Sequence, residues 1–157
     1  MTVYSFKSSG LTQQQSELEK IVKTTMPIGI KTPLEFGAET SGDIFKMHYN
    51  LADQVHDNLR NLLLTNWGER LCQYKLGANL RPLASEFVSQ DDFDSQAISR
   101  IKDAVGKWMS YIDLENFLSE IDRTENTNTA VVNVTITYNV PSLQVKGRKL
   151  QIKLYVM

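Results

Sequence analysis

The sequence has little of what catalysis and metal binding need: one cysteine and two histidines among 157 residues. Cys72 cannot form a disulfide within the chain, which is typical of proteins in a reducing compartment. A zinc site needs four close ligands, and His48, His56 and one distant thiol do not supply them. Glycine-rich phosphate loops, nucleophile elbows and metalloprotease helix motifs are also missing. The sequence therefore predicts no catalytic residue, no cofactor and no metal ion.

Long apolar runs and an excess of one charge are missing too. The longest apolar run is Leu154–Met157, whereas a membrane-spanning helix needs about 20 residues. The segment Met1–Lys7 lacks the charged head and apolar core of a signal peptide. The formal net charge is −1, so no field attracts nucleic acid or anionic lipid. We expect a cytosolic protein with neither a nucleic-acid nor a membrane partner.

What is present suits one folded domain preceded by an arm. A hydrophobic content of 41% and a charged content of 22% are ordinary for a globular domain. Residues 1–42 are polar and weakly patterned, and prolines and glycines interrupt Met26–Gly42. We expect an extended N-terminal arm over residues 1–42, with a short helix near residues 13–22, and a domain over residues 43–157. Gly42–Tyr49 alternates loosely and favours a short strand.

Apolar spacing predicts two long amphipathic helices. Asn50 can cap the first, which ends near Thr65 and has an apolar stripe of Leu51, Val55, Leu59, Leu62 and Leu63. The second is expected from Asp92 to Ile112, with the apolar face Ala97, Ile98, Ile101, Ala104, Val105, Trp108, Met109 and Ile112. A shorter helix is expected over Asn79–Val88. Trp108 is expected in the core, whereas Trp67 either packs locally or faces a partner.

Alternating residues predict three strands at the C-terminal end. Ala130–Val140 and Arg148–Val156 alternate cleanly between apolar and polar residues, and Leu114–Ile121 does so less regularly. Consecutive strands with short polar turns form an antiparallel sheet most simply. We therefore expect an α+β fold in which two long amphipathic helices pack on a C-terminal three-stranded antiparallel sheet, with the extended N-terminal arm outside it.

An acid pair for glycoside hydrolysis is the enzymatic alternative. Glu69, Glu86, Asp91 and Asp94 are candidates by residue type. Nothing in the sequence marks one of them as buried and another as solvated, which is the difference that general acid catalysis needs. With 18 acidic residues in the chain, some pair always looks plausible, so we do not expect an enzyme.

The stretch Asn58–Arg70, together with Leu76-Gly77 after it, resembles the signature of a known protein family. Leu62-Leu63-Leu64-Thr65, then Gly68-Glu69-Arg70, then Leu76-Gly77 resemble the signature of the small, lysozyme-like baseplate wedge proteins of contractile phage tails, a family shared with type VI secretion baseplates. Gly68 and Gly77 allow sharp turns, and Glu69 and Arg70 offer a charge pair that can pin the turn or a neighbour. Two departures are that Leu71–Tyr74 lacks the family's proline and that Tyr111–Leu114 stands where Glu-Pro-Arg often occurs.

The resemblance implies a structural, non-enzymatic subunit that joins the wedge to the first sheath ring and templates sheath assembly. Such subunits occur in multiple copies in the six-fold baseplate of the virion tail and assemble in the host cytoplasm. Alternatives are a baseplate component of a type VI or phage-derived injection system, a peptidoglycan-cleaving lysozyme-type enzyme, or a generic binding domain. The residues expected to contact other wedge proteins are Trp67, Gly68, Glu69, Arg70 and Gly77.

The last strand is the expected contact for the tail sheath protein. A free strand edge accepts an added strand through unpaired backbone groups, and we expect no tail after Met157 to cover this edge. The strand-adding residues are expected to be Leu150, Gln151, Ile152, Lys153, Leu154 and Tyr155. Nearby basic residues either protect the edge from stray pairing or attract an acidic partner strand; nucleic acid is the weaker alternative. A competing interpretation is that Ile44–Tyr49 caps this edge.

Overall fold

The computed structural model describes residues 26–37, 44–86, 89–123 and 130–156. The chain divides into two compact units that meet between Gln54 and Val55, and each is described by itself. The expected boundary between residues 42 and 43 and the expected helix near residues 13–22 lie outside the described residues. No helix in the described ranges is both long and apolar enough to cross a membrane.

The first unit contains a small antiparallel hairpin. Strand β1 (Gly29–Ile30) pairs with β2 (Met47–His48), and a bridge joins Phe36 to Phe45. A strand at β1 was not expected, because the prolines and glycines of Met26–Gly42 were interpreted as excluding regular structure. They exclude a helix, but the backbone still pairs across the hairpin, as in the 2.8 Å bond from Ile28 N–H to His48 O.

Helix α2 (Leu51–Leu64) begins where the sequence predicts. The side chain of Asn50 accepts a 3.0 Å hydrogen bond from the backbone N–H of Ala52, which satisfies one free donor of the first turn. Its buried residues are Val55, Asp57, Leu59, Leu62 and Leu63. Leu51 was expected in the apolar stripe, but 46% of it is exposed.

Helices α3 (Leu80–Glu86) and α4 (Gln90–Trp108) follow. Ser89 caps α4, and its hydroxyl accepts a hydrogen bond from the backbone N–H of Asp92. The expected end of α4 at Ile112 is wrong, because Met109 leaves the helical conformation with φ −139° and ψ 52°. Met109 and Ile112 are nevertheless buried. Their apolar side chains belong to the core, although neither residue is part of the helix.

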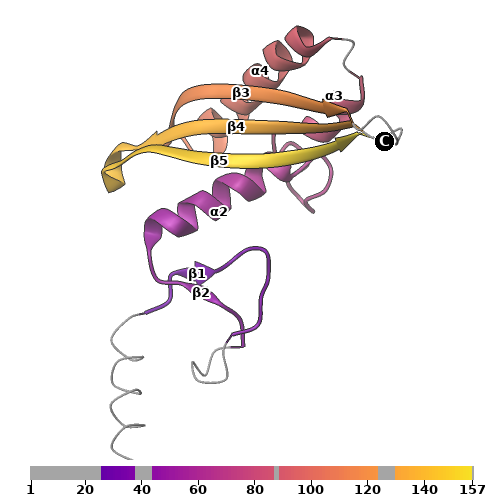
Figure 1. Cartoon of the computed structure of the whole chain (residues 1–157). Coiled ribbons are helices and arrows are strands. Elements are labelled where there is room, and N and C mark those ends of the chain that lie inside the picture. The colour runs from indigo at the N-terminus through magenta and orange to yellow at the C-terminus, as the bar shows by residue number, and fades with distance from the viewer. Residues whose placement is uncertain (1–25, 38–43, 87–88, 124–129, 157) are drawn as a thin grey trace, which may run out of the picture. The chain divides into compact units, whose positions relative to one another are not determined.

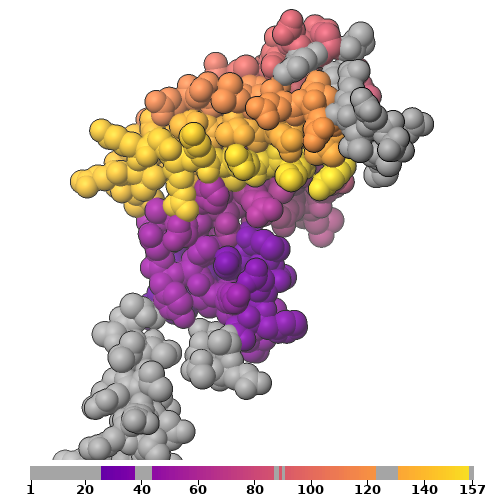
Figure 2. Space-filling view, viewed as in Figure 1, coloured from indigo at the N-terminus to yellow at the C-terminus, as the bar shows by residue number. Residues whose placement is uncertain are grey.

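The C-terminal sheet has three antiparallel strands in the order β3–β4–β5 (Figure 1). They are β3 (Asp113–Arg123), β4 (Ala130–Val140) and β5 (Val145–Val156), with the 3-10 helix η2 (Pro141–Leu143) between the last two. The first strand is longer than the expected Leu114–Ile121, and its register shifts between Leu114 and Asn116. The strands lie side by side at the surface in Figure 2. The expected three-stranded antiparallel sheet is confirmed.

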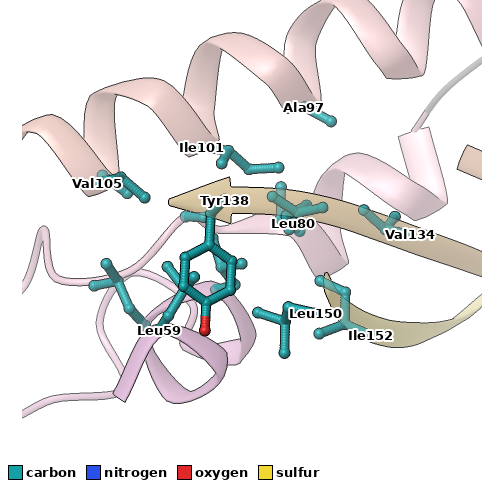
Figure 3. Packing of buried hydrophobic residues seen from close by; sticks show 14 of the residues in the cluster. Leu59, Leu80, Ala97, Ile101, Val105, Val134, Tyr138, Leu150 and Ile152 are labelled. Carbon is teal, nitrogen blue, oxygen red and sulfur yellow. The ribbon is translucent and has the colours of Figure 1, made fainter. Parts of the chain in front are cut away.

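One face of this sheet forms the core with the helices (Figure 3). Every second residue of β4 from Val132 to Val140 is buried, and the residues between them are only partly buried. The helices contribute Leu59, Leu80, Ala97, Ile101 and Val105, among others, to the same cluster. The fold is therefore α+β.

Candidate functional site

The first candidate site is the loop between α2 and α3, residues 65–79, which holds the motif Gly68-Glu69-Arg70. The backbone N–H of Asn66 donates to Glu69 Oε2 at 2.8 Å, and Asn66 Nδ2 donates to Glu69 Oε1 at 2.7 Å. These hydrogen bonds hold the pKa of Glu69 below its ordinary value, because they favour the charged carboxylate. The expected charge pair is absent: the structure describes no ion pair between Glu69 and Arg70. Asn66, and not Arg70, pins the turn.

Trp67 fastens this loop to its neighbours. Its indole Nε1 donates a 3.1 Å hydrogen bond to the carbonyl of Gly77. The guanidinium of Arg100, on α4, lies 5.8 Å from the centroid of the Trp67 ring, and Arg100 Nη1 donates to the carbonyl of Asn79 at 2.7 Å. Trp67 therefore packs locally, and with 46% of it exposed it still offers surface to another protein.

The two glycines of the motif shape the loop. Gly68 has a φ of +86° and Gly77 a φ of +109°, so the positive φ that the motif suggests is present at both. The N–H of Gly68 donates to the carbonyl of Tyr74 at 2.9 Å, which closes the loop on itself. A Cβ at Gly77 would lie 2.1 Å from the carbonyl oxygen of Thr65. Gly77 is buried and supports the loop from within, whereas Gly68 is exposed.

The tip of the loop borders a groove of about 430 Å³. Its lining brings together Arg70 and Gln73 from the loop, Asn58 and Asn61 from α2, and Trp108 and Tyr111 from the end of α4 and beyond, among others. Tyr111 is 45% exposed, and its partial burial raises its pKa. Sequence reasoning missed this groove except for Arg70, because its walls come from three separate segments. The local signal in the sequence was the pair of aromatic residues Trp108 and Tyr111, at the end of α4 and just beyond it.

Trp108 is not fully in the core as expected. It is partly buried against the core and also lines the groove. The ammonium of Lys107 lies 4.8 Å from the centroid of the Trp108 ring. The apolar face of α4 thus continues into an accessible surface at its C-terminal end.

The second candidate site is the outer edge of β5. Among the strands that the structure describes, β5 pairs only with β4. Leu150, Ile152 and Leu154 are buried with at most 4% exposed, so they offer a partner only their backbone. Gln151, Lys153 and Tyr155 are exposed on the opposite face. The alternative cap of this edge, Ile44–Tyr49, instead contributes β2, which pairs with β1.

The carboxylates weighed for glycoside hydrolysis lie in unremarkable places. Glu86 and Asp91 are exposed at a helix end and in a first helical turn. Asp94 accepts a short hydrogen bond from the Ser119 hydroxyl, which joins α4 to β3. The lowered pKa of Glu69 runs opposite to the raised pKa that a general acid needs.

The sulfur and imidazole groups form no recognisable site either. Cys72 is exposed in the loop. His56 Nδ1 lies 2.8 Å from the hydroxyl of the buried Tyr138, so this histidine partners a core residue. His48 belongs to β2 in the first unit. Within the described residues, no group of three or more histidine, cysteine and acidic side chains could hold a metal ion. The geometry of both candidate sites suits binding to another protein.

Comparison with known proteins yields matches at the level of structure. No protein-family model and no curated protein matches the chain. A chain of the anti-feeding prophage baseplate, solved by cryo-EM with six-fold symmetry, is 18% identical, with a TM-score of 0.57 over 76% of this chain and 90% of that chain. A candidate tail lysozyme from Geobacter sulfurreducens is 15% identical, with a TM-score of 0.51 over 70% of this chain and 93% of its own. The chain therefore has the fold that these two phage-tail-related proteins share.

Proposed function

We propose that the protein is a structural, non-enzymatic wedge component of a contractile tail baseplate, either in a phage virion or in a phage-derived injection device. The observation that carries this proposal is the shared fold, which spans 90% of a chain from the anti-feeding prophage baseplate. The motif Gly68-Glu69-Arg70 adds independent support, because its resemblance rests on residue identities and not on the fold. Multiple copies in a six-fold baseplate, assembled in the host cytoplasm, fit this role.

The contact with other wedge proteins is proposed at the α2–α3 loop and its groove. Arg70 is exposed, and the structure describes no ion pair for it. The loop behind it is closed by its own hydrogen bonds, so little conformational entropy is lost when a partner binds. Trp67, Gly68, Glu69 and Gly77 then act mainly by holding Arg70 in position beside the groove.

The contact with the sheath is proposed at β5. A sheath that begins on the baseplate needs a template, and an open sheet edge supplies one through its unpaired N–H and C=O groups. The segment Val145–Val156 is long for an edge strand and pairs on one side only among the described strands. An extended arm of the sheath subunit would add to the sheet along it. The N-terminal arm, residues 1–42, is proposed to bind another baseplate neighbour.

Assembly with purified wedge proteins tests the wedge contact. Arg70→Ala is expected to weaken binding at least tenfold, which corresponds to about 1.4 kcal/mol, without lowering the melting temperature. Lys75→Ala is the matched control, because Lys75 is an exposed cation of the same loop that does not line the groove. Equal binding by both variants and the unchanged chain would remove Arg70 from the interface.

The lysozyme-type alternative rests on the name of the Geobacter protein. A turbidity assay on purified cell walls separates it from a structural role. We expect no clearing of the suspension by the chain. Clearing that disappears when one glutamate or aspartate is replaced by its amide would overturn the non-enzymatic proposal.

A further inference from the structure

The three-stranded sheet has two edges whose outward side chains carry opposite charge. On β5, Lys149 and Lys153 are exposed on the face away from the core. On β3, Glu120 and Asp122 are exposed on that same face. The register confirms the shared face, since Asn133 of β4 is the partner of both Glu120 and Lys153. The acidic edge and the basic edge are therefore about two strand spacings, or ~10 Å, apart.

Neither lysine finds a counter-ion within the sheet. Across the register, Lys153 lies opposite Asn133 and Lys149 lies opposite Thr137, both uncharged. The structure describes no ion pair for either lysine. Both ammonium groups therefore remain available to a strand on the open side of β5.

We propose that the β5 edge selects an acidic strand, with carboxylates four residues apart on its outward face. This inference rests on the strand addition proposed above and specifies the chemistry of the added strand. In a paired strand, a side chain directly opposite another lies about 5 Å away, and opposite charges at that distance attract. Lys149 and Lys153 are separated by four positions, so an added strand in either direction meets both with acidic residues at i and i+4. Gln151 lies between these two lysines and is neutral, so the added strand needs no charged residue opposite it.

The same charges exclude the wrong edge. An acidic strand with this spacing that approached β3 would place one carboxylate directly opposite Glu120 or Asp122, and like charges directly opposite each other destabilise a strand pair. The charge difference thus directs one incoming strand to β5, where the shape of the sheet alone would allow either edge.

A second copy of this chain fits the basic edge poorly. Its β3 strand carries outward acids two residues apart, at Glu120 and Asp122, whereas the lysines are four apart. With Glu120 opposite Lys153, the register of an added β3 leaves a neutral residue, not an acid, opposite Lys149. The β3 strand of a second copy therefore does not match both lysines, and the proposed occupant is a segment of a different protein.

Two synthetic peptides test the selection. Both are nine residues long by design, with valine at the positions that follow the core face and threonine elsewhere; one carries glutamate at i and i+4, the other lysine. Binding is measured by fluorescence anisotropy, and the bound edge is located from backbone amide shifts in NMR spectra. The glutamate peptide is expected to bind β5 at least tenfold more tightly than the lysine peptide, and added salt is expected to reduce the difference.

Charge reversal provides the decisive comparison. The double variant Lys149→Glu/Lys153→Glu is expected to invert the preference between the two peptides. The control Glu120→Lys/Asp122→Lys removes the repulsion at the other edge and is expected to leave the preference at β5 unchanged, even where the glutamate peptide now also binds β3. Matched melting temperatures show that both variants fold. Equal binding of the two peptides at β5 would overturn charge selection and leave strand addition intact. Amide shifts confined to β3, concentration-dependent dimers with Lys149 and Lys153 buried, or no binding by either peptide would overturn both.

Discussion

At the scale of single residues, Gly77 is the position where the α2–α3 loop tolerates least change. Gly77→Ala would place a Cβ 2.1 Å from the Thr65 carbonyl oxygen at a φ of +109°, so we expect a loss of roughly 3 kcal/mol or more in the free energy of unfolding. Gly68→Ala meets only the exposed Tyr74 ring, at 3.3 Å, and should cost about 1–2 kcal/mol. Urea denaturation of both variants measures the difference. An equal cost would show that the close approach at Gly77 relaxes.

The hydrogen bonds from Asn66 to Glu69 give the loop a pH dependence with a defined sign. Because the folded pKa of Glu69 lies below its unfolded value, the carboxylate stabilises the loop above the unfolded pKa of about 4.3. That contribution is lost as the pH falls through the lowered folded pKa. Asn66→Ala is expected to raise the pKa of Glu69 towards its ordinary value, measured by NMR titration of the carboxyl carbon. Gln73→Ala, in the same loop, is the control and should leave the titration in place.

At the scale of helices and strands, the sequence predicted the elements that depend mainly on residues close together in the chain. The apolar spacing of α2, the clean alternation of β4 and β5 and the turn at Gly68 all follow from short stretches of sequence. The end of α4 did not, because Met109 and Ile112 continue an apolar pattern after the backbone has left the helix. A buried loop residue and a buried helical residue look alike in sequence. The pairing of β1 with β2 was missed for a related reason, since backbone hydrogen bonds depend little on residue type.

The candidate sites likewise contain residues that the sequence motif indicated and a groove that only the tertiary fold creates. The motif pointed to Gly68 and Gly77, which have a positive φ, and to Arg70, whose part in binding stays a prediction. The groove beside Arg70 could not be predicted, because Asn58 and Tyr111 are brought together only by the packing of α2 against the end of α4. The partner of Glu69 was mistaken for the adjacent cation, whereas an asparagine three positions earlier supplies both donors.

The start of α4 supplies a prediction at this scale. Ser89→Ala removes the hydroxyl that accepts from the Asp92 N–H, so the helix should lose about 1 kcal/mol of stability. Ser95→Ala is the matched control: that hydroxyl donates to the carbonyl of Asp91 on an exposed face, where alanine is at least as good a helix former. Thermal unfolding followed by circular dichroism measures both. A loss in Ser95→Ala equal to that in Ser89→Ala would show that capping is not the cause.

At the scale of the second unit as a whole, its two candidate sites are linked by the core. The loop is attached to α4 by Arg100, and α4 is attached to β3 by the Asp94–Ser119 hydrogen bond. Residues of α4 and β3 pack in or against the cluster that includes Leu150 and Ile152 of β5. The proposed partners on the loop and on the β5 edge would therefore bind to parts of the chain that share one hydrophobic core.

Hydrogen exchange provides the final prediction, because it reports on the two sheet edges at once. In the free chain, alternate amides of β5 point away from β4 and have no partner strand among the described residues, so they should exchange quickly, as should alternate amides of β3. Amides of β4, paired on both sides, should exchange slowly. If a sheath subunit adds a strand as proposed, the fast amides between Leu150 and Tyr155 should become protected while those of β3 stay fast. The measurement is mass spectrometry or NMR of the complex against the free chain. Protection confined to the helices, or appearing first on β3, would contradict strand addition at β5, because only a strand paired along that edge supplies acceptors to its free N–H groups.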